Sequence, residues 1–242
     1  MKILYKQTII PLSVFAASLF LQNAAQAVNV IPNSNFSNGY NSFTSSYIQV
    51  TTQNPTSGPG MRDEGGYTVL ANPVTAHDSW QPIPAGSPYN TVNGEMLVLN
   101  GSSSALTVWQ TSAVVVTNPL QDYFFQAAVT NLFAPNVAAT NGAILSFQYS
   151  EESSPTVWIT LGTVDLATTI SGQWQVTPGT SAFTIENPSE NIFLRIVNAQ
   201  TEANGNDFAI GLVSLDTTAV PEPAAAMLGG IGFLALLRRR RN

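Results

Sequence analysis

The stretch 95–130, EMLVLNGSSSALTVWQTSAVVVTNPLQDYFFQAAVT, indicates the class of fold. It contains four short runs rich in β-branched and aromatic residues: Glu95–Asn100, Leu106–Gln110, Ala113–Thr117 and Tyr123–Thr130. Glycine, serine, asparagine and proline separate these runs, and such residues favour turns. None of the runs shows the 3.6-residue apolar spacing of a helix. The stretch therefore predicts consecutive β-strands joined by turns.

The same pattern continues on both sides of this stretch. Further runs are Tyr47–Thr51, Tyr67–Ala71, Ala143–Ser150, Thr156–Leu161, Gln173–Thr177, Ala182–Glu186, Ile192–Asn198 and Phe208–Leu215. About twelve strands without a fixed repeat argue against a solenoid and for two packed sheets. We expect residues 28–219 to form one all-β domain, an antiparallel β-sandwich of the jelly-roll type.

The predicted domain is strongly acidic. Of the 8 lysines and arginines only Arg62 and Arg195 lie in it, whereas all 14 acidic residues except Glu222 do. A nucleic-acid-binding domain needs basic patches to neutralise phosphates, so this class is excluded. The chain has no cysteine and one histidine, His77. Disulfides, thiolate metal sites and multi-histidine metal sites are therefore excluded as well.

Residues 1–27 predict a secretory signal peptide. Two lysines precede the apolar stretch 9–21, and Ala25-Gln26-Ala27 then presents the small-x-small pattern of a cleavage site. An uncleaved membrane anchor is the alternative, but the apolar run is short for a span of about 20 residues. We expect cleavage after Ala27 and export of the mature chain.

The C-terminal residues 220–242 have three parts in order. The VPEP sequence at 220–223 comes first, the uncharged apolar segment 224–237 follows, and the chain then carries Arg238, Arg239, Arg240 and Arg241. As a helix the apolar segment would be about 21 Å long, shorter than a hydrocarbon core of about 30 Å. The arginines would stay on the cytoplasmic side of the inner membrane and fix the topology. The tail therefore predicts a short transmembrane helix that holds the chain transiently; a permanent tail anchor is the alternative.

This tripartite tail resembles the PEP-CTERM sorting signal found in exported proteins of Gram-negative bacteria that make extracellular polysaccharide. The resemblance implies that Pro221, Glu222 and Pro223 are the motif read by exosortase, an integral membrane processing enzyme. It also implies that the protein crosses the inner membrane and reaches the cell surface or the medium after processing. An association with exopolysaccharide or biofilm matrix follows as an expectation.

The predicted sandwich resembles the galactose-binding-like jelly rolls, a class that includes many carbohydrate-binding modules. The motifs that carry this resemblance are the opening Asn33-Ser34-Asn35-Phe36, the segment 93–101 followed by Val108-Trp109-Gln110-Thr111, and the segment 205–210. The resemblance spans nearly the whole predicted domain. It implies a β-sandwich that binds glycans.

Relatives of that class often hold a structural calcium ion through acidic residues. This chain has Ser37 and Gly211 at the corresponding positions. Calcium requires several oxygen ligands, so we expect no metal site and no cofactor. Asp207, Asn206 and Asn33 remain as the possible ligands of a weaker site.

Candidate catalytic groups are few. Glu151-Glu152 and Asp63-Glu64 are adjacent acid pairs, but neighbours on a strand point to opposite faces, whereas glycoside hydrolysis needs two facing carboxylates. A serine–histidine–acid triad could use only His77, which has no nucleophile elbow nearby. We predict that the protein is not an enzyme, with an unusual glycoside hydrolase as the less favoured alternative.

Aromatic rings are the candidate ligand platforms, because their flat faces pack against sugar rings. Trp109 alternates on the same side as Thr107 and Thr111, which predicts exposure, and Trp80 lies in a loop beside His77. We therefore take Trp80, Trp109 and His77 as ligand-binding candidates, with core packing as the alternative for each. Trp158, between Val157 and Ile159, is predicted to be core, and Trp174 fits either role.

Together these features predict an exported surface or matrix protein with a glycan-binding β-sandwich. A structural or adhesion protein that binds other proteins is the main alternative. An ice-binding protein would need a regular threonine array, which the sequence does not show.

Overall fold

The computed structural model describes residues 29–52, 61–83, 95–111, 114–115, 121–133, 141–151, 155–167, 169–176, 182–185 and 191–217. The predicted signal peptide with Ala25 and Ala27, and the predicted sorting tail 220–242, lie outside these ranges. Within them, no helix is long and apolar enough to cross a membrane.

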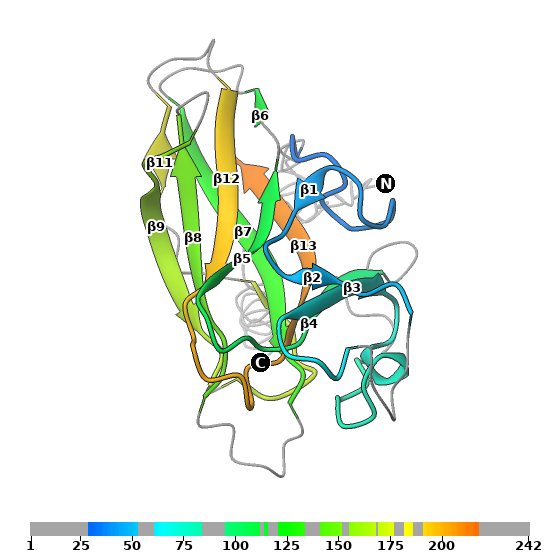
Figure 1. Cartoon of the computed structure of the whole chain (residues 1–242). Helices are drawn as coiled ribbons and strands as arrows, with labels where there is room; N and C mark the ends of the chain where they lie inside the picture. Colours follow the sequence, from blue (N-terminus) through cyan, green and yellow to red (C-terminus); the bar gives the residue numbers. More distant parts are fainter. Residues whose placement is uncertain are drawn as a thin grey trace, which may run out of the picture.

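Two β-sheets form the described chain (Figure 1). Sheet A contains, in spatial order, β1 (Phe43–Thr44), β5 (Leu106–Thr111), β12 (Asn191–Asn198), β8 (Ile144–Ser150) and β9 (Ile159–Asp165), with β6 (Val114–Val115) beside β12. Sheet B contains β10 (Gln175–Val176), β7 (Asp122–Asn131), β13 (Phe208–Asp216), β4 (Met96–Leu99), β3 (Gly66–Leu70) and β2 (Ile48–Gln49), with β11 (Phe183–Thr184) beside β7.

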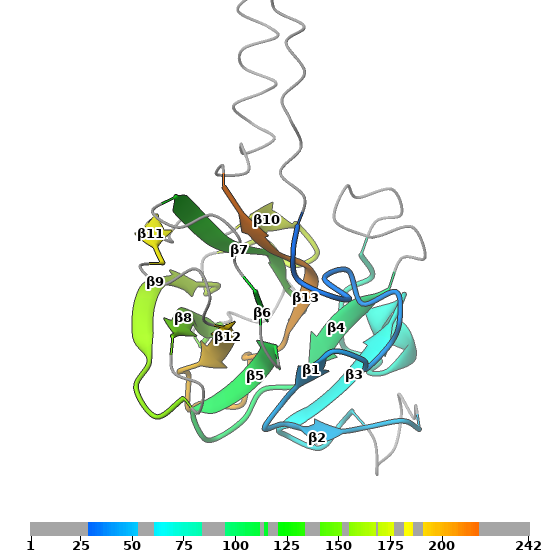
Figure 2. The same cartoon turned by 90° about the horizontal axis from the view of Figure 1, so that it is seen from above.

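The predicted all-β sandwich is confirmed, with local differences. The strand pairs are antiparallel except β2 and β3, which run parallel. The sequence pattern missed β1, and it placed the strand that begins at Ile159 three residues too early. The chain passes repeatedly between the sheets, from β4 in sheet B to β5 in sheet A and from β12 in sheet A to β13 in sheet B (Figure 2). This connectivity resembles that of a jelly roll.

The main core lies between the sheets and follows the two-residue period of the strands. On β12, Ile192, Leu194 and Ile196 are fully buried, whereas the residues between them are half-buried on the opposite face. Phe125 of β7 contacts Trp109 of β5 and Phe147 of β8, with ring centroids 6.0 and 5.3 Å apart. These contacts join the two sheets.

A second apolar cluster covers the outer face of sheet B. Met96 and Val98 of β4 belong to it, together with Met61, Ala76 and Trp80 from residues 61–83. Because Leu97 and Leu99 face the main core, β4 is buried on both sides, which explains its uninterrupted apolar sequence. The outer face of sheet A, in contrast, carries several polar side chains, among them Arg195 and Gln148.

Candidate functional site

A row of polar side chains crosses the outer face of sheet A. Arg195 of β12 is paired with Gln110 of β5 on one side and with Gln148 of β8 on the other. Gln110 is paired in turn with Thr44 of β1, and Gln148 with Thr160 of β9. Directly paired residues point to the same face of a sheet. These five residues, here called the polar row, therefore span all five strands from β1 to β9.

Arg195 is held in place at the centre of the polar row. Its Nε donates a hydrogen bond to Oε1 of Gln148 at 2.6 Å, and its Cζ lies 3.9 Å from the ring centroid of Trp158. Nε2 of Gln148 donates to Oγ1 of Thr160 at 3.2 Å and to Oγ of Ser146 at 3.1 Å. A ring and an amide thus fix the plane of the guanidinium, an arrangement that favours directed hydrogen bonding.

The charge of Arg195 is not balanced by an acid in the described chain. The ion pair found there joins Asp78 to Arg62 at 2.7 Å, and Nδ1 of His77 lies 3.8 Å from the same carboxylate. Burial lowers the pKa of the Arg195 guanidinium, which nevertheless remains charged. Its terminal N–H groups have no acceptor among the described residues.

Trp109 is not exposed, so the expectation that it forms a ligand platform is wrong. Its side chain is 1% exposed and packs in the main core. The reason is a β-bulge: Ile196 of β12 pairs with Trp109, but the next residue, Val197, pairs with Thr107. Val108 is the extra residue, and the strict alternation of faces is lost there.

Trp158 is not in the core, contrary to the sequence-based expectation. It is half-buried beside Arg195, while its neighbours Val157 and Ile159 are 62% and 50% exposed. Among the described residues β9 is an edge strand of sheet A, so no further strand lies beside the apolar residues at its start. Trp174, for which either role was expected, packs against the second apolar cluster.

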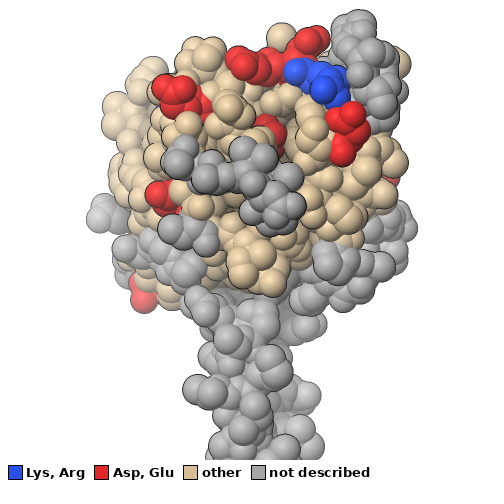
Figure 3. Space-filling model, turned by 90° about the horizontal axis from the view of Figure 1, so that it is seen from below, with Lys and Arg blue, Asp and Glu red and all other residues tan. Residues whose placement is uncertain are grey.

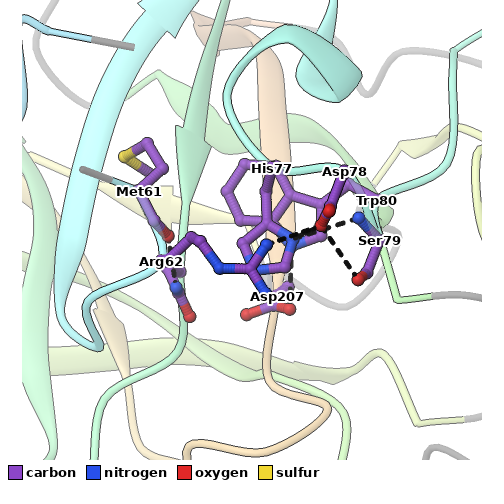
Figure 4. Close-up of polar contacts among 8 residues, drawn as sticks. Met61, Arg62, His77, Asp78, Ser79, Trp80 and Asp207 are labelled. Atoms are coloured by element: carbon purple, nitrogen blue, oxygen red, sulfur yellow. Dashed lines mark hydrogen bonds and ion pairs between the residues drawn. The ribbon is translucent and has the colours of Figure 1, made fainter. Parts of the chain in front are cut away.

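The structure brings His77 and Trp80 together, but they do not form a ligand platform (Figure 4). They hold the loop formed by residues 61–83 in place. The two rings are stacked with their centroids 5.0 Å apart. Trp80 is only 2% exposed, and its Nε1 donates to Oδ2 of Asp207 at 2.9 Å. The ring therefore cannot present a face to a sugar, and its hydrogen bond fixes residues 61–83 to the start of β13.

The local sequence explains how this loop is shaped. The 3₁₀ helix η2 (Pro73–Thr75) begins with proline, which is suited to a helix start. Asn72 caps it by accepting a hydrogen bond from the N–H of Val74. His77 follows after the C-cap residue Ala76, and burial and the charge of Arg62 lower the pKa of His77. His77 is therefore neutral near pH 7 and stacks on Trp80 as an uncharged ring.

The three residues left for a weak calcium site have protein partners instead. Oδ1 of Asn33 accepts from the N–H of Asn38, and Oδ1 of Asn206 accepts from Asn198. Asp207 accepts from the N–H of Gly101 at 3.0 Å as well as from Trp80. Among the described residues no three His, Cys, Asp or Glu side chains are grouped so that they could hold a metal ion. The end of the molecule seen in Figure 3 is mostly uncharged where it is described, with acidic side chains scattered over it.

Asp207 is a buried carboxylate whose protonation should affect stability. Burial raises its pKa to about 6, and the charge of Glu64 adds to this, against the two hydrogen bonds that lower it. The pKa in the folded state is thus above the unfolded value near 3.8. The stabilising contribution is complete below the unfolded pKa and is lost as the pH rises through the folded pKa.

We therefore expect the wild type to gain stability relative to Asp207→Asn when the pH falls from 7.5 to 5. The gain in the free energy of unfolding should be about 1.4 kcal/mol, because the wild type takes up close to one proton over about one pH unit below the folded pKa. Urea unfolding of both proteins across this range measures it. His77 has a lowered pKa and so acts in the opposite direction, but it is present in both proteins and cancels in the difference. Parallel stability curves would show that Asp207 is ionised throughout.

Sequence reasoning missed the polar row, although one signal was present. Arg195 is one of two basic residues in the predicted domain, and it interrupts the apolar run Ile192–Val197. Its position places it on the face opposite to Leu194 and Ile196. A charged residue inside a strand of this composition could have marked the outer face of sheet A. Its partners Gln148 and Trp158 depend on long-range pairing and carry no such local signal.

The fold and the tail have counterparts among known proteins. The fold is that of a two-sheet β-sandwich: a cyclase from Fischerella sp. TAU is similar over 78% of this chain and 96% of its own, with 11% sequence identity and a TM-score of 0.51. At this identity the likeness concerns the fold alone. Residues 219–241 match the PEP-CTERM protein-sorting motif. The predicted motif is thus confirmed, and it indicates an exported protein of the cell surface or the extracellular space.

Two further structures are less similar. A xylan-binding domain from CBM 22 matches over 80% of this chain and 99% of its own, with 14% identity and a TM-score of 0.42. The enzymatically active domain of tailspike protein 4 from bacteriophage CBA120 matches with 10% identity and a TM-score of 0.47 over 78% of this chain, which spans 21% of that longer one. Both scores are too low to support an argument about function. No curated protein matches the sequence.

Proposed function

We propose that this is an exported surface or matrix protein, processed by an exosortase, whose β-sandwich binds glycan chains on the outer face of sheet A. The sorting motif at 219–241 supports export and processing. Association with the exopolysaccharide of the producing cell belongs to the same proposal. The polar row with Trp158 supports the binding function.

The observation that carries the glycan proposal is the set of Arg195, Gln148 and Trp158 on an open sheet. Glycan sites combine an aromatic ring with planar hydrogen-bonding groups, which read the hydroxyls of the sugar. The polar row supplies two amides, two hydroxyls and a guanidinium. Across five strands spaced about 4.8 Å apart it extends over roughly 19 Å. That length is suited to binding a short segment of an extended glycan chain.

The composition of the polar row also supports binding without catalysis. It contains no carboxylate, whereas glycoside hydrolysis uses two of them on opposite sides of the bond that is cleaved. We therefore propose that the protein holds its glycan without cleaving it. Incubation with a bound polysaccharide followed by reducing-end analysis would reveal any turnover.

Replacing Trp158 by alanine should weaken glycan binding by about fivefold or more, because truncating an aromatic residue that contacts the ligand commonly costs more than 1 kcal/mol. Affinity electrophoresis of the processed protein in gels that contain neutral and acidic polysaccharides measures the effect. Ile48→Ala is the matched control, because Ile48 is 72% exposed and lies on sheet B. If a polysaccharide retards both variants equally, the outer face of sheet A is not the glycan-binding surface.

The adhesion alternative has one supporting observation. Val157 and Ile159 flank Trp158 at the edge of sheet A and are 62% and 50% exposed. Exposed apolar residues on an edge strand favour contacts with another protein. If no polysaccharide retards the wild type, this edge becomes the preferred binding surface.

A further inference from the structure

We infer that the glycan bound by the polar row carries carboxylate groups, as in a uronic-acid polysaccharide. This inference rests on the proposed function and narrows its ligand class. The two basic residues in the predicted domain differ in their partners. Arg62 is paired with Asp78 at 2.7 Å, whereas Arg195 has no acidic partner among the described residues.

The orientation of Arg195 leaves its carboxylate-binding edge available. The hydrogen bond to Gln148 uses Nε, and Trp158 covers the flat side of the guanidinium. The two terminal nitrogens keep four N–H donors in one plane. Such a fork matches the two oxygens of a carboxylate and binds them through a pair of charge-assisted hydrogen bonds.

The groups around Arg195 on this face are neutral. Gln110 and Gln148 are its neighbours across the strands. Phe193 and Val197 precede and follow it on the same face of β12, and Val197 is paired with Thr107 and Ser146. A carboxylate that approaches Arg195 along the sheet therefore meets amides, hydroxyls and apolar groups, without a like charge in the polar row.

The physical reason for an anionic ligand is the partial burial of an uncompensated cation. A half-buried charge loses hydration, and a partner of opposite charge restores the lost interactions. The overall negative charge of the domain acts against long-range attraction of an anion. At 0.15 M salt, however, charges more than about 8 Å apart are largely screened. The carboxylate is therefore recognised locally, by Arg195, and not by a basic surface.

The test compares polysaccharides that differ only in their carboxylates. Polygalacturonate, alginate and hyaluronate are each prepared as the sodium salt, here called the acid form, and as the methyl ester. Each preparation is titrated into the processed protein at neutral pH, and calorimetry measures its affinity. We expect at least one acid form to bind about tenfold more tightly than its ester. Arg195→Gln should bring the two forms to equal affinity, and Arg62→Gln, which removes the same charge elsewhere, should keep the difference.

The outcomes separate this inference from the proposed function. Equal binding of acid and ester forms, or binding of neutral glycans alone, overturns the carboxylate inference and leaves glycan binding intact. Absence of binding to every glycan, neutral or acidic, overturns both. If Arg195→Gln lowers the melting temperature too far for titration, the comparison of acid and ester forms on the wild type still decides whether the carboxylate is recognised. Arg195→Lys is expected to retain only part of the difference in affinity between the two forms.

Discussion

Replacing Trp80 by alanine is expected to lower the free energy of unfolding by about 3–5 kcal/mol. Trp80 is 2% exposed and belongs to the second apolar cluster together with Met61 and Val98. The substitution removes this contact area and leaves a cavity between the loop and sheet B. It also removes the Nε1–H group that binds Asp207, and a buried acceptor that loses its donor adds to the cost.

A second variant separates the two contributions. Trp80→Phe keeps much of the apolar volume but lacks the indole N–H, so it should lose a smaller part of the stability. Urea unfolding followed by circular dichroism gives both values. The Ile48→Ala variant is the control at an exposed position. A loss below about 1 kcal/mol for Trp80→Ala, as at ordinary surface positions, would contradict the role of Trp80 as the support of residues 61–83.

Replacing Pro221, Glu222 and Pro223 by alanines is expected to stop C-terminal processing almost completely. These residues lie in the PEP-CTERM protein-sorting motif, and the substitution leaves the apolar segment 224–237 and the four arginines unchanged. Membrane insertion depends on hydrophobicity and flanking positive charge, so it should persist. The full-length form should then accumulate in the inner membrane.

The measurement is the mass and the cellular fraction of the protein in the producing organism. Replacing Arg238, Arg239, Arg240 and Arg241 by neutral residues is the companion variant. This variant should instead be retained less well in the inner membrane, because the free-energy cost of moving the four charges across the membrane is removed. If the alanine variant of the motif reaches the surface with the same mass as the wild type, the motif is not read by a processing enzyme.

The sequence predicted the strands well because their signals are local. The run Tyr123–Thr130 lies within β7, and Phe208–Leu215 within β13. Side-chain orientation was harder to predict. The bulge at Val108 turns Trp109 into the core, and the edge position of β9 leaves Trp158 on the surface. Both depend on which strands become neighbours, and short-range periodicity does not contain this information.

The contacts of the buried polar groups were even less accessible from sequence. Trp80 and Asp207 are 127 positions apart and meet through the packing of a loop on sheet B. The polar row similarly joins five strands that are scattered along the chain. Arg195 alone gave a local indication, as a charge inside an apolar strand. A charged residue at such a position can therefore mark a functional face before a structure is known.

The central claim, that glycans bind on the outer face of sheet A, can be tested through the indole N–H signals of the 4 tryptophans. The processed protein is labelled with ¹⁵N and titrated with the polysaccharide that binds it most tightly, and the Trp158 signal is assigned from Trp158→Phe. Trp80 and Trp109 are 2% and 1% exposed and serve as internal references. The account predicts that the Trp158 signal shifts on binding while those of Trp80 and Trp109 stay in place. A bound glycan that shifts the Trp80 signal and leaves that of Trp158 unchanged would contradict it.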